Sequence, residues 1–210
     1  MTAKDARIES VIGTANTWIV GDDDEVIVID PGTDAAAVLG AVGDREILAV
    51  ICTHGHAAHC EAALEVAERD EAPVALHPAD RRAWREVHDT DPDIEMEDEG
   101  AFEVAGITLE VLHAPGHSRG SVCLYSEELD AVFAGDVIGQ DGPVTHEHEY
   151  PNWGRQLDAI GSQVLTLPPQ TTIMPGHGDE FTVAIAEKRF NGWVSAGPSQ
   201  ALDDGSAGEE

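Results

Sequence analysis

The sequence predicts an α/β fold in which buried strands alternate with helices. Short apolar runs stop at turn-forming residues, as residues 25–30 do before Pro31 and Gly32, and stretches with helical periodicity separate several of these runs. Such alternation is typical of layered domains in which helices cover sheets. The chain has 210 residues, 42% of them hydrophobic, which is enough for the core of one such domain.

The first half of the chain provides three strands and the helices that follow them. The expected strands are residues 25–30, 47–53 and 73–77. The expected helices are residues 33–42, 59–69 and 80–87. Thr33 is the expected N-cap of the first helix, because its hydroxyl can accept a hydrogen bond from a free backbone amide. Residues 88–100 are acidic and contain a proline, so we expect an exposed loop there.

The second half repeats this scheme and ends in a polar segment. The expected strands are residues 101–104, 107–112, 121–125, 131–134 and 171–174, and the expected helices are residues 153–165 and 182–194. Residues 196–210 show no periodicity and are rich in Gly, Ser, Asp and Glu. We therefore expect one domain over residues 1–195 and a disordered acidic tail over 196–210.

Three histidines follow the apolar run of residues 47–52 within a short stretch. His54, His56 and His59 belong to the sequence Thr-His-Gly-His-Ala-Ala-His. A loop that leaves the end of a buried strand can direct several side chains to one point, and imidazole is the commonest side-chain ligand of transition metals. This stretch predicts a metal site, with Ala58 at the position between the second and third histidines.

Further candidate ligands lie at other strand ends. His117 follows Pro115 and Gly116, Asp136 follows Phe-Ala-Gly, and His177 follows Pro-Gly. Glycine and proline allow the backbone to turn tightly where each of these side chains is presented. The pattern favours one site assembled from distant segments, although Asp136 by itself could simply cap the turn that follows it.

These motifs together resemble those of the metallo-β-lactamase superfamily, and within it the glyoxalase II-type thioester hydrolases. That family has an HxHxDH motif, then a His in a Pro-Gly-His turn, an Asp after a glycine and a final His, and the similarity spans roughly residues 10–195. The resemblance implies a four-layer αββα sandwich. It also implies that the motif aspartate of the family is replaced here by Ala58.

The resemblance further implies a ligand set and a chemistry. His54, His56 and His117 would hold a first metal ion, His59 and His177 a second, and Asp136 would bridge the two as the catalytic carboxylate. We expect zinc, one or two ions, with iron as the alternative. Two ions at such a site would activate water and polarise the attacked carbonyl. Without a carboxylate at position 58, the second pocket would be incomplete.

The loop over residues 139–152 is a second candidate region. It contains His146, His148 and Tyr150, which could contact substrate or supply a replacement ligand, whereas alternating His and Glu is also typical of a solvated acidic loop. In relatives this region borders the substrate.

The charge excludes several partners. The chain has 41 acidic and 11 basic residues, a formal net charge of −30, so nucleic acid and anionic membranes are poor partners and a small-molecule substrate is expected. Self-repulsion of this size is relieved by salt, which favours a halophilic protein, with an ordinary acidic protein from an arginine-preferring genome as the alternative.

The sequence lacks a candidate membrane span and a signal peptide, and its number of cysteines is odd. No apolar stretch approaches the ~18 to 20 residues of a membrane span, and the first residues lack the apolar centre of a signal peptide. We expect a soluble, cytoplasmic protein in which Cys52, Cys60 and Cys123 are reduced. The sequence does not specify an oligomeric state.

Three functions remain open at this point. The first is a glyoxalase II-like metallo-hydrolase of an acyl thioester or related small ester, impaired at the second metal pocket. The second is a mononuclear iron persulfide dioxygenase, which the same superfamily also contains. The third is a catalytically inactive metal-binding relative, including an engineered variant in which Asp at position 58 was changed to Ala.

Overall fold

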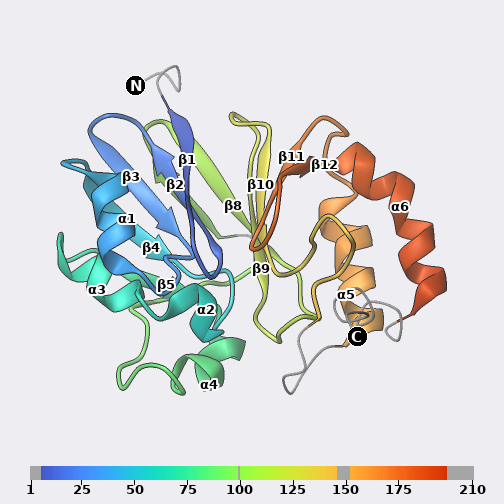
Figure 1. Cartoon of the computed structure of the whole chain (residues 1–210), viewed down its shortest axis with the longest axis horizontal. Coiled ribbons are helices and arrows are strands. Elements are labelled where there is room, and N and C mark those ends of the chain that lie inside the picture. Colours follow the sequence, from blue (N-terminus) through green and yellow to red (C-terminus); the bar gives the residue numbers. More distant parts are fainter. Residues whose placement is uncertain (1–5, 99, 146–151, 198–210) are drawn as a thin grey trace, which may run out of the picture.

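A computed structural model describes residues 6–98, 100–145 and 152–197 of the chain. Two sheets pack face to face, and helices cover the outer face of each sheet, so that four layers follow one another across the molecule (Figure 1). The predicted α/β sandwich is therefore confirmed.

The first sheet comes from the N-terminal half of the described chain. Its strands, in spatial order, are β1 (Arg7–Ile12), β2 (Asn16–Gly21), β3 (Glu25–Ile29), β4 (Glu46–Ile51), β5 (Val74–Leu76) and β6 (Ile94–Glu95). The first three strands are antiparallel, whereas β3 to β6 are parallel. The parallel strands therefore end at the same edge of the sheet.

The second sheet comes from the C-terminal half. Its strands, in spatial order, are β12 (Phe181–Thr182), β11 (Thr172–Pro175), β10 (Ala131–Gly135), β9 (Val122–Ser126), β8 (Ile107–His113) and β7 (Ala101–Val104). Here β10 and β11 form the parallel pair, with Gly135 opposite Pro175. Asp136 and His177 thus follow neighbouring parallel strands.

Helices cover each sheet on one side only. The first sheet carries α1 (Ala35–Val42), α2 (Ala57–Cys60), α3 (Ala63–Glu68), the 3₁₀ turn η2 (Pro78–Asp80) and α4 (Arg81–Trp84). The second sheet carries α5 (Trp153–Ala159), the π-helical turn η3 (Ile160–Val164) and α6 (Val183–Ala196). In Figure 1 the two helical layers lie on opposite flanks of the paired sheets.

Strand β3 shows why the sheets are buried on both faces. Ile27 and Ile29 point into the core between the two sheets, where they pack with Trp18 and Phe133. Val26 and Val28 point the other way, into the core beneath α1 and α3. Because side chains alternate along a strand, an uninterrupted apolar run such as this one fills two cores at once.

Several element boundaries differ from the prediction. The helix expected over residues 59–69 is divided into α2 and α3, because the chain turns at Glu61 and Ala62. The N-cap of α1 is Asp34, not Thr33, and its carboxylate accepts from the backbone amide of Ala37. Strands β1, β2, β6 and β12 were not predicted.

Two other predictions concern the membrane and the cysteines. Among the residues that the structure describes, no helix has the length and apolar character needed to cross a membrane. All three cysteines are buried and unpaired, as expected, and burial raises the pKa of both Cys60 and Cys123 to about 12. Residues 198–210, most of the expected tail, lie outside the described residues.

Candidate metal centre

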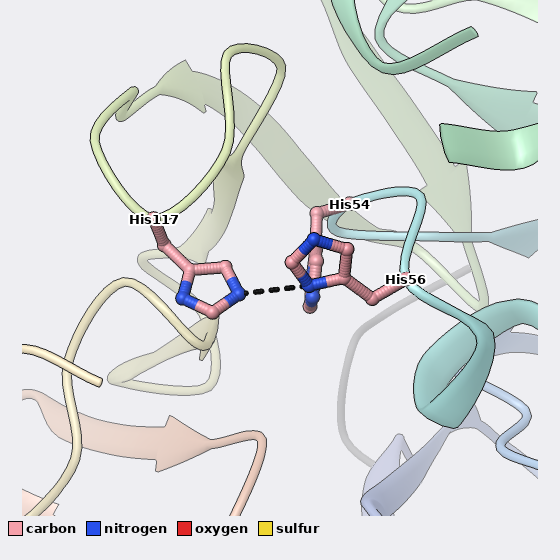
Figure 2. A group of neighbouring side chains, drawn as sticks. All are labelled: His54, His56 and His117. Carbon is pink, nitrogen blue, oxygen red and sulfur yellow. Dashed lines mark hydrogen bonds between the residues drawn. The ribbon is translucent and has the colours of Figure 1, made fainter. Parts of the chain in front are cut away.

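Three imidazoles from two loops meet at the edge where the sheets join. His54 and His56 lie on the loop after β4, and His117 lies on the loop between β8 and β9 (Figure 2). Nδ1 of His56 and Nε2 of His117 face each other 3.0 Å apart. One nitrogen from each of the three rings falls within 4.8 Å of the others, a spacing compatible with one ion.

A second group lies directly beside the first. Nε2 of His59 is 3.3 Å from Nε2 of His177 and 3.4 Å from Oδ2 of Asp136. The other carboxylate oxygen, Oδ1 of Asp136, is 3.4 Å from His177 Nε2. Oδ2 is also 3.5 Å from His117 Nε2, so Asp136 lies between the two groups. The structure thus brings together all six residues that the sequence predicted as ligands.

The tight fit around Asp136 depends on a glycine. A Cβ atom at Gly176 would lie 2.5 Å from Asp136 Oδ1 and 2.6 Å from Cε1 of His59. Only a residue without a side chain lets the turn before His177 approach this closely.

Hydrogen bonds on the far side of the rings fix which nitrogen faces the centre. Nδ1 of His59 lies 3.0 Å from Oδ2 of Asp30, and Nδ1 of His117 lies 2.8 Å from the carbonyl oxygen of Val144. An acceptor at Nδ1 places a proton there and leaves Nε2 for the centre. His54 follows the same logic, since Thr53 Oγ1 donates to Asp30 and can accept from His54 Nδ1 at 3.2 Å.

The donor set fits a divalent transition metal. Nε2 of His54 is buried and has no hydrogen-bond partner among the described residues, which is costly for a polar atom unless an ion binds it. His54, His59, His117 and Asp136 are each at most 3% exposed. Two nitrogens ~2.0–2.1 Å from a tetrahedral zinc lie roughly 3.3 Å apart, close to the nitrogen–nitrogen distances of 3.0 Å between His56 and His117 and 3.3 Å between His59 and His177.

Burial and charge move the histidine pKa values in opposite directions. Burial lowers the pKa of His117 to about 4, against the opposing effect of Asp136. Burial, assisted by His59 and His117, also lowers the pKa of His54 well below its usual value. For His59, burial is outweighed by the carboxylates of Asp30 and Asp136, which raise its pKa to about 10. Without an ion, the His59 ring is therefore protonated on both nitrogens at neutral pH.

Ala58 lies in the first turn of α2, between His56 and His59, and is partly buried. Its carbonyl oxygen accepts a hydrogen bond of 3.3 Å from Thr14 Oγ1. Its methyl group offers no donor atom to the neighbouring pocket of His59, His177 and Asp136.

Among the described residues, other histidines and Cys60 lie outside the cluster. His146, His148 and Tyr150 lie outside the described residues. His77 and His113 stack on each other with ring centroids 4.2 Å apart, away from the cluster. Cys60 is fully buried and its thiol donates to the carbonyl of Gly55, in keeping with a packing role.

Three supporting residues were missed by the sequence analysis. Asp30 orients Thr53 and His59, Asp80 binds the Gly55 amide, and the fully buried Gln156 donates to the carbonyl oxygens of Asp136 and Val144. Asp30 could have been found, because a carboxylate at the end of a parallel strand lies at the same edge as the ligands. Asp80 and Gln156 act through long-range backbone contacts and have no local signal.

Comparisons with known proteins agree with this geometry. The family model for the metallo-beta-lactamase superfamily matches residues 11–177. A Bacillus subtilis protein named "Probable metallo-hydrolase YqgX" is 31% identical over 185 residues, covering 80% of this chain and 87% of that protein. "Hydroxyacylglutathione hydrolase GloC" of Haemophilus influenzae is 26% identical, covering 86% of this chain and 93% of that protein.

Solved structures show the same architecture. The BLEG-1 B3 metallo-beta-lactamase superposes with a TM-score of 0.80 at 26% identity, covering 87% of this chain and 97% of that one. TTHA1623 in a di-iron-bound form superposes with a TM-score of 0.71 at 27% identity, with the same two coverages. The family match, the four-layer fold and the histidine and aspartate cluster agree: this chain belongs to the metallo-beta-lactamase superfamily.

Proposed function

We propose that this protein is a metal-dependent hydrolase of an acyl thioester or related small ester, with its second metal pocket impaired. The observation that carries this proposal is the position of Asp136, between the group of His54, His56 and His117 and the group of His59 and His177. The similarity to a protein named as a hydroxyacylglutathione hydrolase supports thioesters as the substrate class.

Each side chain has a defined task in this proposal. His54 and His117 would hold a first ion through Nε2, and His56 through Nδ1. Oδ2 of Asp136 lies near both groups, and Oδ1 lies near His177. Divalent ions held there supply an activated water and polarise the carbonyl that is attacked. The buried walls of the cluster limit competition from bulk water, and His177, whose side chain is 35% exposed, lies on the open side.

Ala58 makes the two groups unequal. The first group keeps three imidazoles with Asp136 nearby, whereas the second has His59, His177 and the shared Asp136. We therefore propose one tightly held ion and one weakly held ion. Three imidazoles with a carboxylate suit zinc, and the di-iron form of TTHA1623 keeps iron as the alternative. His146, His148 and Tyr150 remain proposed substrate contacts.

Metal analysis combined with a thioester assay tests the proposal. Purified protein should contain about one zinc per chain and hydrolyse at least one member of a panel of small acyl thioesters. A chelator should abolish the activity, and added zinc should restore it. His117→Ala, prepared in the same way, is the control that loses the first ion. Iron without hydrolysis would favour the dioxygenase, and a metal-loaded protein with no turnover of any thioester or ester would overturn the proposal.

A further inference from the structure

Asp80 is a buried carboxylate whose hydrogen-bond partners are residues next to the ligands in the sequence. Asp80 ends the 3₁₀ turn after β5 and is 3% exposed. Oδ1 accepts from the backbone amide of Gly120 at 2.6 Å. Oδ2 accepts from the backbone amide of Gly55 at 3.1 Å and from the hydroxyl of Ser118 at 2.6 Å.

The donors to Asp80 come from both loops that carry the first group of ligands. Gly55 lies between His54 and His56, and Ser118 directly follows His117. The two loops belong to different sheets and are separated by about sixty residues of chain. One carboxylate therefore joins them across the boundary between the sheets.

Gly55 and Gly120 lie so close to Asp80 that neither position has room for a side chain. A Cβ atom at Gly120 would lie 2.8 Å from the carboxyl carbon of Asp80, and one at Gly55 would lie 2.9 Å from its carbonyl oxygen. Ser121 extends the network, because its hydroxyl accepts from the Ser118 amide and lies 2.6 Å from the Ser118 hydroxyl. The turn after His117 is thus fixed by buried hydrogen bonds at each step.

A second contact already brings the two sheets together here. The backbone amide of Val122 donates to the carbonyl oxygen of Thr53 at 3.0 Å. That bond places the strand ends side by side, but it lies before His54 on one loop and after His117 on the other. Asp80 acts closer to the ligands, at the residue between His54 and His56 and at the residue after His117.

We propose that Asp80 is a positioning residue of the metal centre. Its carboxylate holds the loop of His54 and His56 at a fixed distance from His117, and so sets the affinity and the coordination geometry of the first group. This inference rests on the metal centre of the proposed function but not on any substrate. The partners of His59 and His177 are different, since Asp30 binds His59 and no contact of Asp80 reaches either ring among those described.

Cobalt(II) titration of the metal-stripped protein tests this role, because the visible absorption of bound cobalt reports its coordination. Asp80→Asn keeps the size of the side chain but turns one acceptor oxygen into a donor, so at least one of the two backbone amides, of Gly120 or of Gly55, loses its acceptor. We expect cobalt affinity at the tighter site to fall ~10- to 100-fold, the range for partners that orient metal ligands, together with a changed visible spectrum.

Asp93→Asn is the matched control. Asp93 accepts from the backbone amide of Val74 at 2.9 Å, at the other end of the same strand β5, and contacts neither ligand loop. We expect its cobalt affinity to stay within ~2-fold and its spectrum to stay unchanged, well below the effect expected of an orienting partner. Urea unfolding of the metal-free variants, measured in parallel, separates a loss of stability from a loss of positioning.

The outcomes distinguish this proposal from the proposed function. Wild-type cobalt affinity and spectrum in Asp80→Asn would overturn the positioning role. The role would also be overturned if Asp80→Asn lost no more cobalt affinity than an Asp93→Asn variant that is destabilised to the same extent. If Asp80→Asn does not fold, Ser118→Ala decides, because it removes one donor and keeps both backbone amides; an unchanged cobalt spectrum there overturns the role. A wild-type protein that binds cobalt but hydrolyses no thioester would overturn the proposed function alone.

Discussion

Oδ2 of Asp30 lies 3.0 Å from Nδ1 of His59, and both side chains are 1% exposed. Asp30 also accepts from the amide and the hydroxyl of Thr53, so its carboxylate is held in one orientation. The pair fixes the direction of the His59 ring and, together with Asp136, raises the pKa of His59 against the effect of burial. A metal ion at Nε2 must therefore displace a proton that the metal-free protein keeps at neutral pH.

The first prediction concerns the pH dependence of stability in the metal-stripped protein. The pKa of His59 is raised to about 10 in the folded protein, whereas a histidine in the unfolded chain has a pKa of ~6.5. The contribution of His59 to the free energy of unfolding is therefore fully present below pH ~6.5 and is lost as the pH rises toward 10. The lowered pKa values of His117 and His54 act oppositely, because their contribution to stability is present above pH ~6.5 and is lost as pH falls. For His117 the loss extends to pH about 4. We expect greatest stability near pH 6.5 from these three groups.

Urea unfolding between pH ~6.5 and ~8.5 measures the contribution of His59 to stability. Above this range the buried thiols of Cys60 and Cys123, whose pKa values are raised to about 12, also lower the free energy of unfolding. The free energy of unfolding should fall by up to about 1.4 kcal/mol per pH unit from this one group. His59→Gln should remove that slope. The same slope in both proteins would mean that His59 is not charged in the folded state.

The second prediction separates the two groups of ligands. His117→Ala removes one of three imidazoles from the group that faces Asp136, so zinc affinity at the tighter site should fall at least ~100-fold. His59→Ala affects the pocket that already lacks a donor at Ala58, and the tighter site should lose less than ~10-fold. Isothermal titration of metal-stripped proteins measures both. Equal losses in the two variants would contradict this asymmetry.

The third prediction concerns salt. A net charge of −30 spread over the chain produces repulsion that ions screen, so the melting temperature should rise from low to molar KCl. A gain of about 2 kcal/mol corresponds to roughly 4–8 °C for a chain of this size. Thermal unfolding of the metal-stripped protein in a KCl series measures it, and a flat profile would argue against a halophilic protein.

The fold could be predicted where strands are buried on both faces. Strands β3, β4 and β10 are uninterrupted apolar runs, and their position is visible in the sequence. Strand β1 reads Arg-Ile-Glu-Ser-Val-Ile, has no fully buried residue, and pairs only with β2. A local pattern of that kind does not distinguish an edge strand from a loop, since the pairing that makes it a strand is not local.

The metal ligands could be predicted because they follow buried strands that are visible in the sequence. His54, His117, Asp136 and His177 stand where strands end, so the layered fold alone brings them to one edge. The residues that hold these ligands in place could not be predicted in the same way. Asp80 meets Gly55 and Gly120 across 25 and 40 residues of chain, and nothing in the sequence around Asp80 indicates those partners.

The most direct test of the proposed function is the change Ala58→Asp, compared with Ala57→Asp. Ala58 is partly buried and directly precedes His59, whereas Ala57 is exposed, so Ala57→Asp adds the same charge one residue earlier on the surface. Ala58→Asp should raise the zinc content from about one to about two ions per chain and increase thioester hydrolysis at least ~100-fold, while Ala57→Asp should change neither. No gain in metal or turnover from Ala58→Asp, or an equal gain from Ala57→Asp, would contradict the impaired-hydrolase account.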